Sequence, residues 1–194
     1  QRRVALGSMC SLNPPEELEL ADLLCELHPW AQCVRFARCG GETAAVAARI
    51  ARASSGRSRI AICGYHGWQD WYLAANLGGD DALRNHLLPG LAPAGVPREL
   101  RGTTLTFPYN DLQAFHALIA AHEHDLACIV MEPARQDPPQ PGFLETVRAE
   151  TRRHGILLVF DEITIGFRVH VGGVHMHLGI TPRSEERRVG KECS

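Results

Sequence analysis

Two uninterrupted apolar runs constrain the fold of this chain more than any other feature. They are LACIVM, with residues 127–131 at its core, and ILLVF at 156–160. A strand with one face in water alternates polar and apolar residues, whereas a continuous apolar run is typical of a strand covered on both faces. The helix-like segment 142–155 separates the runs, and a connection of that length joins parallel strands. We therefore expect an α/β fold, a three-layer sandwich with a mostly parallel sheet between helices.

The remaining segments continue this alternation of strands and helices. Three further short runs resemble strands: QCVRFA at 32–37, RIAIC at 59–63 and TTLTF at 103–107. Two helices are expected at 42–55, where Gly56 ends the first, and at 110–125, where Asn110 is the expected capping residue. The segment 76–101 is rich in Gly, Pro and Leu and predicts a surface excursion with a short helix or two.

Composition restricts the class of protein. A chain of 194 residues with 45% hydrophobic content can bury a substantial core. Its formal net charge of −2 offers no electrostatic reason to bind nucleic acid or an anionic membrane, and no apolar run approaches the roughly 20 residues of a membrane span. Seven cysteines without a C-x-x-C pair indicate a reducing cytoplasm. The first residue is not Met, so we expect a fragment of a longer protein.

Polar and small residues follow each expected strand. Gly40 and Gly41 come after the first, Tyr65 and His66 after RIAIC, Glu132 after LACIVM and Asp161 after ILLVF. Ligands of open parallel sheets bind beyond the carboxyl ends of the strands, so these residues predict one site for an anion and a flat ring. A tight turn at the glycines, ordinary loop residues at 65–66 and a capping role for the aspartate remain alternatives.

Two groups of histidines are candidate metal ligands, at 122 and 124 and at 170, 175 and 177. Neither has a carboxylate or cysteine at a usual ligand spacing, so surface histidines are the better interpretation and no metal site is predicted. A nucleotide-binding domain would use the same edge of the sheet, but the chain has neither G-x-G-x-x-G nor a P-loop.

Several motifs in this order resemble one known family. They are VRFARCGGETAAVAARIARASSGR, ICGYHGWQDWY, FPYNDL, the EP pair at 132–133, GFLETVRAETRRHGILLVFDEI and the GFR at 166–168. Together they cover about residues 9–182 and resemble the class III, fold-type I aminotransferases that depend on pyridoxal 5'-phosphate (PLP). The glutamate-1-semialdehyde aminomutase-like branch is the most similar. The resemblance implies part of the large domain of such an enzyme, and a homodimer at full length.

The resemblance also implies which residues bind the cofactor: Gly40, Gly41, Tyr65, His66, Glu132, Asp161 and Ile163. The glycine pair would hold the phosphate through backbone N–H groups, and Tyr65 would stack on one face of the ring while Ile163 packs on the other. The histidine would shape the loop, and Glu132 would support the substrate or the cofactor pocket. Asp161 would pair with the ring nitrogen and keep it protonated, so that the ring withdraws electrons from the substrate carbon.

The family also needs a lysine that holds the cofactor covalently, and the only lysine here is Lys191. The residues before it, RSEERRVG, are too charged for the buried strand that presents this lysine in relatives. Moreover, RSEERRVGKEC resembles the translation of a common DNA-sequencing adapter. We therefore expect residues 1–182 to be a fragment of the PLP-binding large domain and 183–194 to be a non-native tail, and no catalytic residue is assigned.

The expected function of the native protein is that of a PLP-dependent aminotransferase. It would transfer an amino group from a small-molecule amino donor to a carbonyl substrate, or move an amino group within one carbonyl substrate. The truncated chain would be inactive. One alternative is a glutamate-1-semialdehyde 2,1-aminomutase that makes 5-aminolevulinate. The other is a lysine-free relative that binds PLP or a partner chain without catalysis.

Overall fold

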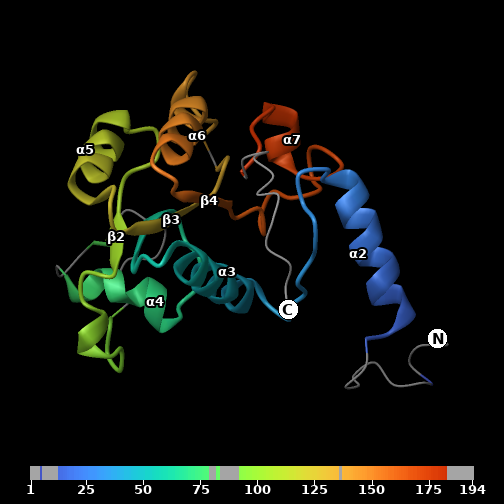
Figure 1. The fold of residues 1–194 in the computed structure, drawn as a ribbon, viewed down its shortest axis with the longest axis horizontal. Coiled ribbons are helices and arrows are strands. Elements are labelled where there is room, and N and C mark those ends of the chain that lie inside the picture. Colours follow the sequence, from blue (N-terminus) through green and yellow to red (C-terminus); the bar gives the residue numbers. More distant parts are fainter. Residues whose placement is uncertain (1–4, 6–12, 79–81, 84–91, 136, 183–194) are drawn as a thin grey trace. The chain divides into compact units, whose positions relative to one another are not determined.

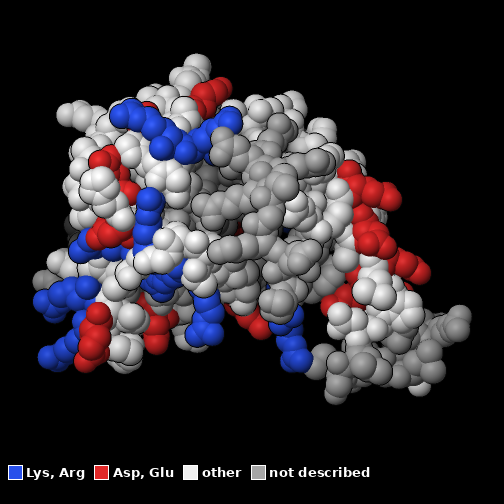
Figure 2. All heavy atoms as spheres, viewed as in Figure 1, with Lys and Arg blue, Asp and Glu red and all other residues white. Residues whose placement is uncertain are grey.

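The computed structural model describes Ala5 and residues 13–78, 82–83, 92–135 and 137–182. The chain forms two compact units, Gln1–Arg35 and Phe36–Ser194. The first contains helix α2 (Pro15–Leu27), whose first turn carries Glu16 and Glu17 at the positive end of the helix dipole. Figure 2 shows the acidic side chains gathered on this helix. Within the described ranges, no helix combines the length and the hydropathy needed to cross a membrane.

The second unit contains a sheet of four strands that pair in parallel. These are β1 (Arg59–Cys63), β2 (Thr104–Thr106), β3 (Leu126–Met131) and β4 (Leu157–Phe160), and their order in the sheet is β2-β1-β3-β4. Every residue of β3 is buried, because it lies between two strands and beneath helices on both faces. This burial explains the uninterrupted run LACIVM and confirms the predicted parallel sheet.

One face of the sheet is covered by α3 (Gly40–Ser55), α4 (Asp70–Leu73) and the short helix η1 (Ala74–Leu77). The small side chains of Ala44, Ala48 and Ala51 form the buried stripe of α3, and they let the helix pack directly on β3. Gly56, at φ 69, ends α3 in the left-handed conformation, as the sequence predicts.

The opposite face is covered by α5 (Leu112–His122) and α6 (Phe143–Arg153), whose buried side chains pack against β1, β3 and β4. Figure 1 shows these two helices on one side of the strands and α3 on the other. The three-layer α/β sandwich predicted from the sequence is therefore confirmed. Two short elements complete the unit, η2 (Arg98–Leu100) in the predicted surface excursion and α7 (Val174–Leu178) after β4.

Three local predictions are wrong. Residues 32–37 form no strand, because no described segment pairs with them. The run ILLVF is not covered on both faces, because β4 lies at an edge of the described sheet, where Leu157 is exposed and only Leu158 of the strand is buried. The cap of α5 is Asp111 and not Asn110, because Asp111 Oδ1 accepts from the N–H of Ala114 at 2.8 Å. Asn110 has φ 62 and uses its side chain to bind the backbone of Gln140 and Pro138.

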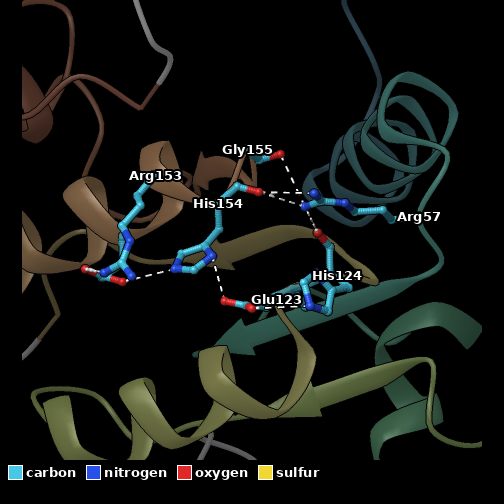
Figure 3. Close-up of polar contacts among 8 residues, drawn as sticks. Arg57, Glu123, His124, Arg153, His154 and Gly155 are labelled. Carbon is cyan, nitrogen blue, oxygen red and sulfur yellow. Dashed lines mark hydrogen bonds and ion pairs between the residues drawn. The ribbon is translucent and has the colours of Figure 1, made fainter.

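Arg57 ties three segments together at the amino ends of β3 and β4 (Figure 3). Its Nη1 donates to the carbonyl oxygens of Leu126 and His154, both at 3.1 Å, and to that of Gly155 at 3.4 Å. These carbonyls lie at the start of β3 and just beyond α6, where a helix leaves carbonyl groups without partners. The cation therefore fixes the end of the sheet opposite to the predicted site.

Candidate functional site

The carboxyl ends of the strands surround a pocket of about 270 Å³. All the residues predicted to form one site line it: Gly40, Gly41, Tyr65, His66, Glu132, Asp161 and Ile163. They come from the start of α3 and from the segments that follow β1, β3 and β4. The expected convergence at one edge of the sheet is thus present, while the role of each residue stays a prediction.

The start of α3 forms one wall of this pocket. Its first residues, Gly40 and Gly41, follow Cys39 in the extended conformation, so the N–H groups of the first turn lack partners within the helix. A Cβ on Gly40 would overlap the side chain of Ile163, which comes from the segment after β4. The glycines therefore leave backbone donors at the positive end of a helix dipole, an arrangement that attracts anions.

The loop after β1 presents Tyr65 beside this helix end. Tyr72, which is fully buried, donates from its hydroxyl to the carbonyl oxygen of Gly64 at 3.0 Å and so anchors the loop. Burial raises the pKa of Tyr72 and keeps its hydroxyl a neutral donor. The rings of Tyr65 and Tyr72 meet edge to face with centroids 5.8 Å apart, which fixes the orientation of Tyr65.

Asp161 directly follows β4 and is a nearly buried carboxylate, with its side chain 9% exposed. Its Oδ2 lies 2.8 Å from Nδ1 of His66, and its Oδ1 accepts from the N–H of Ile163 at 3.0 Å. The backbone N–H of Asp161 donates to the carbonyl of Met131 at 2.8 Å, so the parallel pairing with β3 also sets its position. These donors satisfy the oxygens of a carboxyl group that would otherwise be costly to bury.

Glu132 is the second acid of the pocket. Burial raises its pKa, and Arg135, whose Nε lies 3.0 Å from Glu132 Oε2, acts in the opposite direction. A Cβ on Gly64 would lie 2.6 Å from this same oxygen, so the carboxyl group is packed closely beneath the loop after β1. The glutamate is therefore held at one position beside Asp161.

Glu162, the neighbour of Asp161, has a structural role instead. It accepts from the N–H groups of Val174 at 2.7 Å and His175 at 2.9 Å, and it lies 2.6 Å from His175 Nδ1. Burial alone would raise its pKa, but the hydrogen bonds from His175 and Val174 together outweigh burial and lower the pKa. The first turn of α7 is thereby capped and tied to the end of β4.

Sequence reasoning missed several residues that also line the pocket: Cys39, Trp68, Gln69 and Thr164. The amide of Gln69 occupies the volume that a Cβ would need on either Gly41 or Gly67. Gly67 itself has φ 100, a conformation that strongly favours glycine. In the sequence, the glycines at 41 and 67 could have indicated a close contact. They point to Gln69 only once the segments that contain Gly41 and Gly67 are known to touch.

The arrangement suits a flat anionic ligand. Helix N–H groups can hold the anion, Tyr65 offers a ring face, and the carboxylate of Asp161 can pair with a protonated ring nitrogen. None of the described residues that line the pocket is Lys or Arg, so the donors on this wall are neutral groups. No group of three or more His, Cys, Asp or Glu side chains with metal-binding geometry occurs in the described ranges.

Comparisons with known proteins agree on one family. The sequence model of the family described as Aminotransferase class-III matches residues 2–182. A curated relative, the glutamate-1-semialdehyde 2,1-aminomutase of Acidobacterium capsulatum, is 39% identical over 181 residues, which are 90% of this chain and 41% of the relative. The chain thus spans about two fifths of that relative's length.

Solved structures give the same result. An omega-transaminase from Sphaerobacter thermophilus superposes with a TM-score of 0.78 at 32% identity, over 93% of this chain and 43% of that one. A transaminase with PLP bound superposes with a TM-score of 0.79 at 27% identity, over 93% of this chain and 42% of that one.

Proposed function

The chain belongs to the class-III aminotransferase family, and we propose that the native protein uses pyridoxal 5'-phosphate to transfer or move an amino group on a carbonyl substrate. The observation that carries the proposal is the carboxylate of Asp161, which is buried at the end of β4 and held at 2.8 Å by His66. The PLP that a transaminase of the same fold contains supports the choice of cofactor.

The residues of the pocket fit this cofactor on chemical grounds. Gly40 and Gly41 offer backbone N–H groups for a phosphate, and neither position has room for a side chain of its own, because a Cβ there would overlap Ile163 or Gln69. Tyr65 and Ile163 would hold the two faces of the ring, while Glu132 would support the pocket from below the loop after β1. Asp161 would accept a hydrogen bond from the ring nitrogen and, by its negative charge, keep that nitrogen protonated.

When bound, the cofactor supplies an electron-withdrawing ring that stabilises negative charge on the substrate carbon. The protein's own contribution is to orient and polarise that ring. His66 holds the carboxylate of Asp161 in place, and Ile163 fixes its second oxygen through a backbone N–H. Proton transfer at the substrate carbon requires a basic amine, and residues 1–182 contain no lysine.

We propose that residues 1–182 are part of the PLP-binding large domain and that 183–194 do not belong to the native protein. The match to the family model supports this boundary, because it covers residues 2–182. Lys191 lies outside the described residues. Resequencing the source locus across the codon for Pro182 tests the boundary. A reading frame that continues into an apolar strand, a lysine and a Gly-rich turn supports it, whereas a frame that continues with RSEERRVGKECS contradicts it and revives the lysine-free, non-catalytic alternative.

We also propose that the full-length protein is a cytoplasmic homodimer. Two apolar side chains that line the pocket, Trp68 and Ile163, are more than half exposed, as are Phe167, Val169 and Val171 in the segment after β4. A second copy of the protein would cover such a surface. Cys25, Cys33, Cys39, Cys63 and Cys128 are free thiols, which suits a reducing compartment.

The reaction itself is tested on the full-length protein. Incubation with PLP, glutamate and a carbonyl acceptor should release 2-oxoglutarate, and the Asp161→Asn variant should lose this activity. The aminomutase of Acidobacterium capsulatum favours a second candidate, glutamate-1-semialdehyde aminomutase. That candidate predicts 5-aminolevulinate from glutamate-1-semialdehyde without any 2-oxoglutarate. If a full-length protein that carries the lysine forms neither 2-oxoglutarate nor 5-aminolevulinate, both candidate functions are contradicted.

A further inference from the structure

Gln69 lies between two loops at the edge of the pocket. It directly precedes α4, and it is one of the residues that line the pocket. A Cβ on Gly41 would overlap the amide nitrogen of Gln69, and a Cβ on Gly67 would overlap its amide oxygen. A Cβ on Gly67 would also lie 3.1 Å from the Cα of Gly41, so the two glycine segments pack closely around this amide. The amide therefore has a defined position beside the first turn of α3.

The polar atoms of this side chain have no hydrogen bonds within the described part of the chain. Its Oε1 is buried from solvent without a partner, and no described residue bonds its Nε2. Buried amide groups without partners are rare because they lose their hydrogen bonds to water on folding. The amide nitrogen can only donate, so a ligand in the pocket that accepts hydrogen bonds would give Nε2 a partner. Such a ligand has to match an amide that lies against a helix N-terminus.

An anion matches this position best. The Nε2 of Gln69 is the atom nearest to the place of a Gly41 Cβ, so the amide donors lie beside the backbone N–H groups that begin α3. The helix dipole adds a partial positive charge at the same point. Because no described lining residue is Lys or Arg, an anion here depends on neutral donors, and each one contributes a larger share of the binding.

We propose that Gln69 is a phosphate ligand, whose amide N–H₂ donates to the phosphate of the cofactor beside the N–H groups of Gly40 and Gly41. The assignment deepens the proposed function and rests on it, because the phosphate is that of pyridoxal 5'-phosphate. It also explains the two glycines. Side chains at positions 41 and 67 are excluded because the amide occupies their volume, so the residues at 41, 67 and 69 form one coupled unit.

The test separates the contribution of the phosphate from that of the ring. Equilibrium dialysis of the full-length apoprotein measures the Kd of pyridoxamine 5'-phosphate and of pyridoxamine, neither of which needs the lysine to bind. The Kd of pyridoxamine divided by the Kd of pyridoxamine 5'-phosphate gives a ratio that reports the phosphate contacts alone. Removing one hydrogen bond to a charged group lowers affinity by about tenfold, so Gln69→Ala should lower the ratio about tenfold. Gln69→Glu, which keeps the shape but places a carboxylate there, should lower it further.

Two more variants sharpen the result. Gln113→Ala, at an exposed position on α5, is the matched control and should leave the ratio unchanged. Gly41→Ser should bind poorly alone, because the new Cβ meets the Gln69 amide. In the Gln69→Ala background it should recover most of the ratio, since its hydroxyl then has room to reach the anion.

The outcomes distinguish the two proposals. A wild-type ratio near one means that no phosphate site exists and overturns the proposed function together with this inference. A large wild-type ratio that neither Gln69→Ala nor Gln69→Glu changes overturns the inference alone and leaves the proposed function intact. A fall in affinity for both ligands by the same factor also overturns it, because Gln69 would then act on the ring or on the fold and not on the phosphate.

Discussion

His66 Nδ1 lies 2.8 Å from Asp161 Oδ2, although the two residues are 95 positions apart in the chain. The second ring nitrogen, Nε2, lies 3.3 Å from the carbonyl oxygen of Cys63. A carboxylate only accepts hydrogen bonds, so Nδ1 is the donor to Asp161. The pair joins the loop after β1 to the end of β4, and in the proposed site it places a hydrogen-bond donor behind the carboxylate that meets the ring nitrogen.

This relationship predicts graded effects of substitution at position 66. His66→Phe removes the donor and should lower kcat/KM of the full-length enzyme about tenfold, as expected for one hydrogen bond to a charged group. His66→Asn keeps a donor near the place of Nδ1 and should retain more activity. Asp161→Asn should cost about 10²-fold or more, because the ring nitrogen loses its negative partner.

The readout that isolates the mechanism is the ¹⁵N chemical shift of the ring nitrogen in bound, labelled pyridoxamine 5'-phosphate. It should report a protonated nitrogen in the wild type and an unprotonated one in Asp161→Asn. A protonated nitrogen in Asp161→Asn would show that this carboxylate does not set the charge of the ring.

Arg57 predicts a stability effect far from the pocket. Its guanidinium donates to three backbone carbonyl oxygens. Arg57→Met removes this donor from all three. The free energy of unfolding should fall by about 2 kcal/mol, measured by urea denaturation. The matched control is Arg153→Met on α6, because Arg153 is 71% exposed and its ion pair with Glu150 spans 3.5 Å. That control should lose about 0.5 kcal/mol or less, and equal losses in the two variants would contradict the assignment.

Local pattern predicted most of this fold, and the failures have a common physical cause. LACIVM is a strand buried along its whole length, as its composition requires. ILLVF also forms a strand, but β4 lies at an edge of the described sheet, and of its residues only Leu158 is buried. Residues 32–37 also resemble a strand in sequence, but a strand needs a partner, and pairing is a non-local property. The cap of α5 went to Asp111 because Asn110 is engaged with Gln140, which lies 30 positions away in the chain.

The residues of the site divide in the same way, into those that local sequence pattern identifies and those that depend on non-local contacts. Asp161 and Tyr65 were identifiable because each directly follows an expected strand, and the carboxyl ends of parallel strands meet at one edge. Gln69 was not, since its position depends on close contact between the loops that contain Gly41 and Gly67. Arg135 was missed for a similar reason, because its importance depends on the buried carboxyl group three residues earlier.

Glu162 predicts a loss of stability at low pH. Its pKa in the folded protein is below the ordinary value of 4.5, so the unfolded chain binds the proton more readily. The stabilisation is therefore fully present above about pH 4.5 and disappears as the pH falls through the folded-state pKa. Glu162→Gln should lower the free energy of unfolding by about 1–2 kcal/mol at pH 7 and by much less near pH 3. Urea denaturation at both values checks this, and a difference that does not depend on pH would contradict it.

Glu132 predicts a dependence of the opposite sign. Burial raises its pKa above 4.5, so the folded protein binds the proton more readily than the unfolded chain does. The charged form opposes folding, and the free energy of unfolding should fall as the pH rises from about 4.5 through the folded-state pKa. Arg135 moderates this effect, because its guanidinium lies 3.0 Å from the carboxylate. Arg135→Met should therefore raise the pKa of Glu132 further, which a ¹³C titration of the Glu132 carboxyl group measures directly. Arg148→Met on α6 serves as the control and should leave that titration unchanged, and a pKa of Glu132 that stays the same in Arg135→Met would show that the ion pair is not maintained in solution.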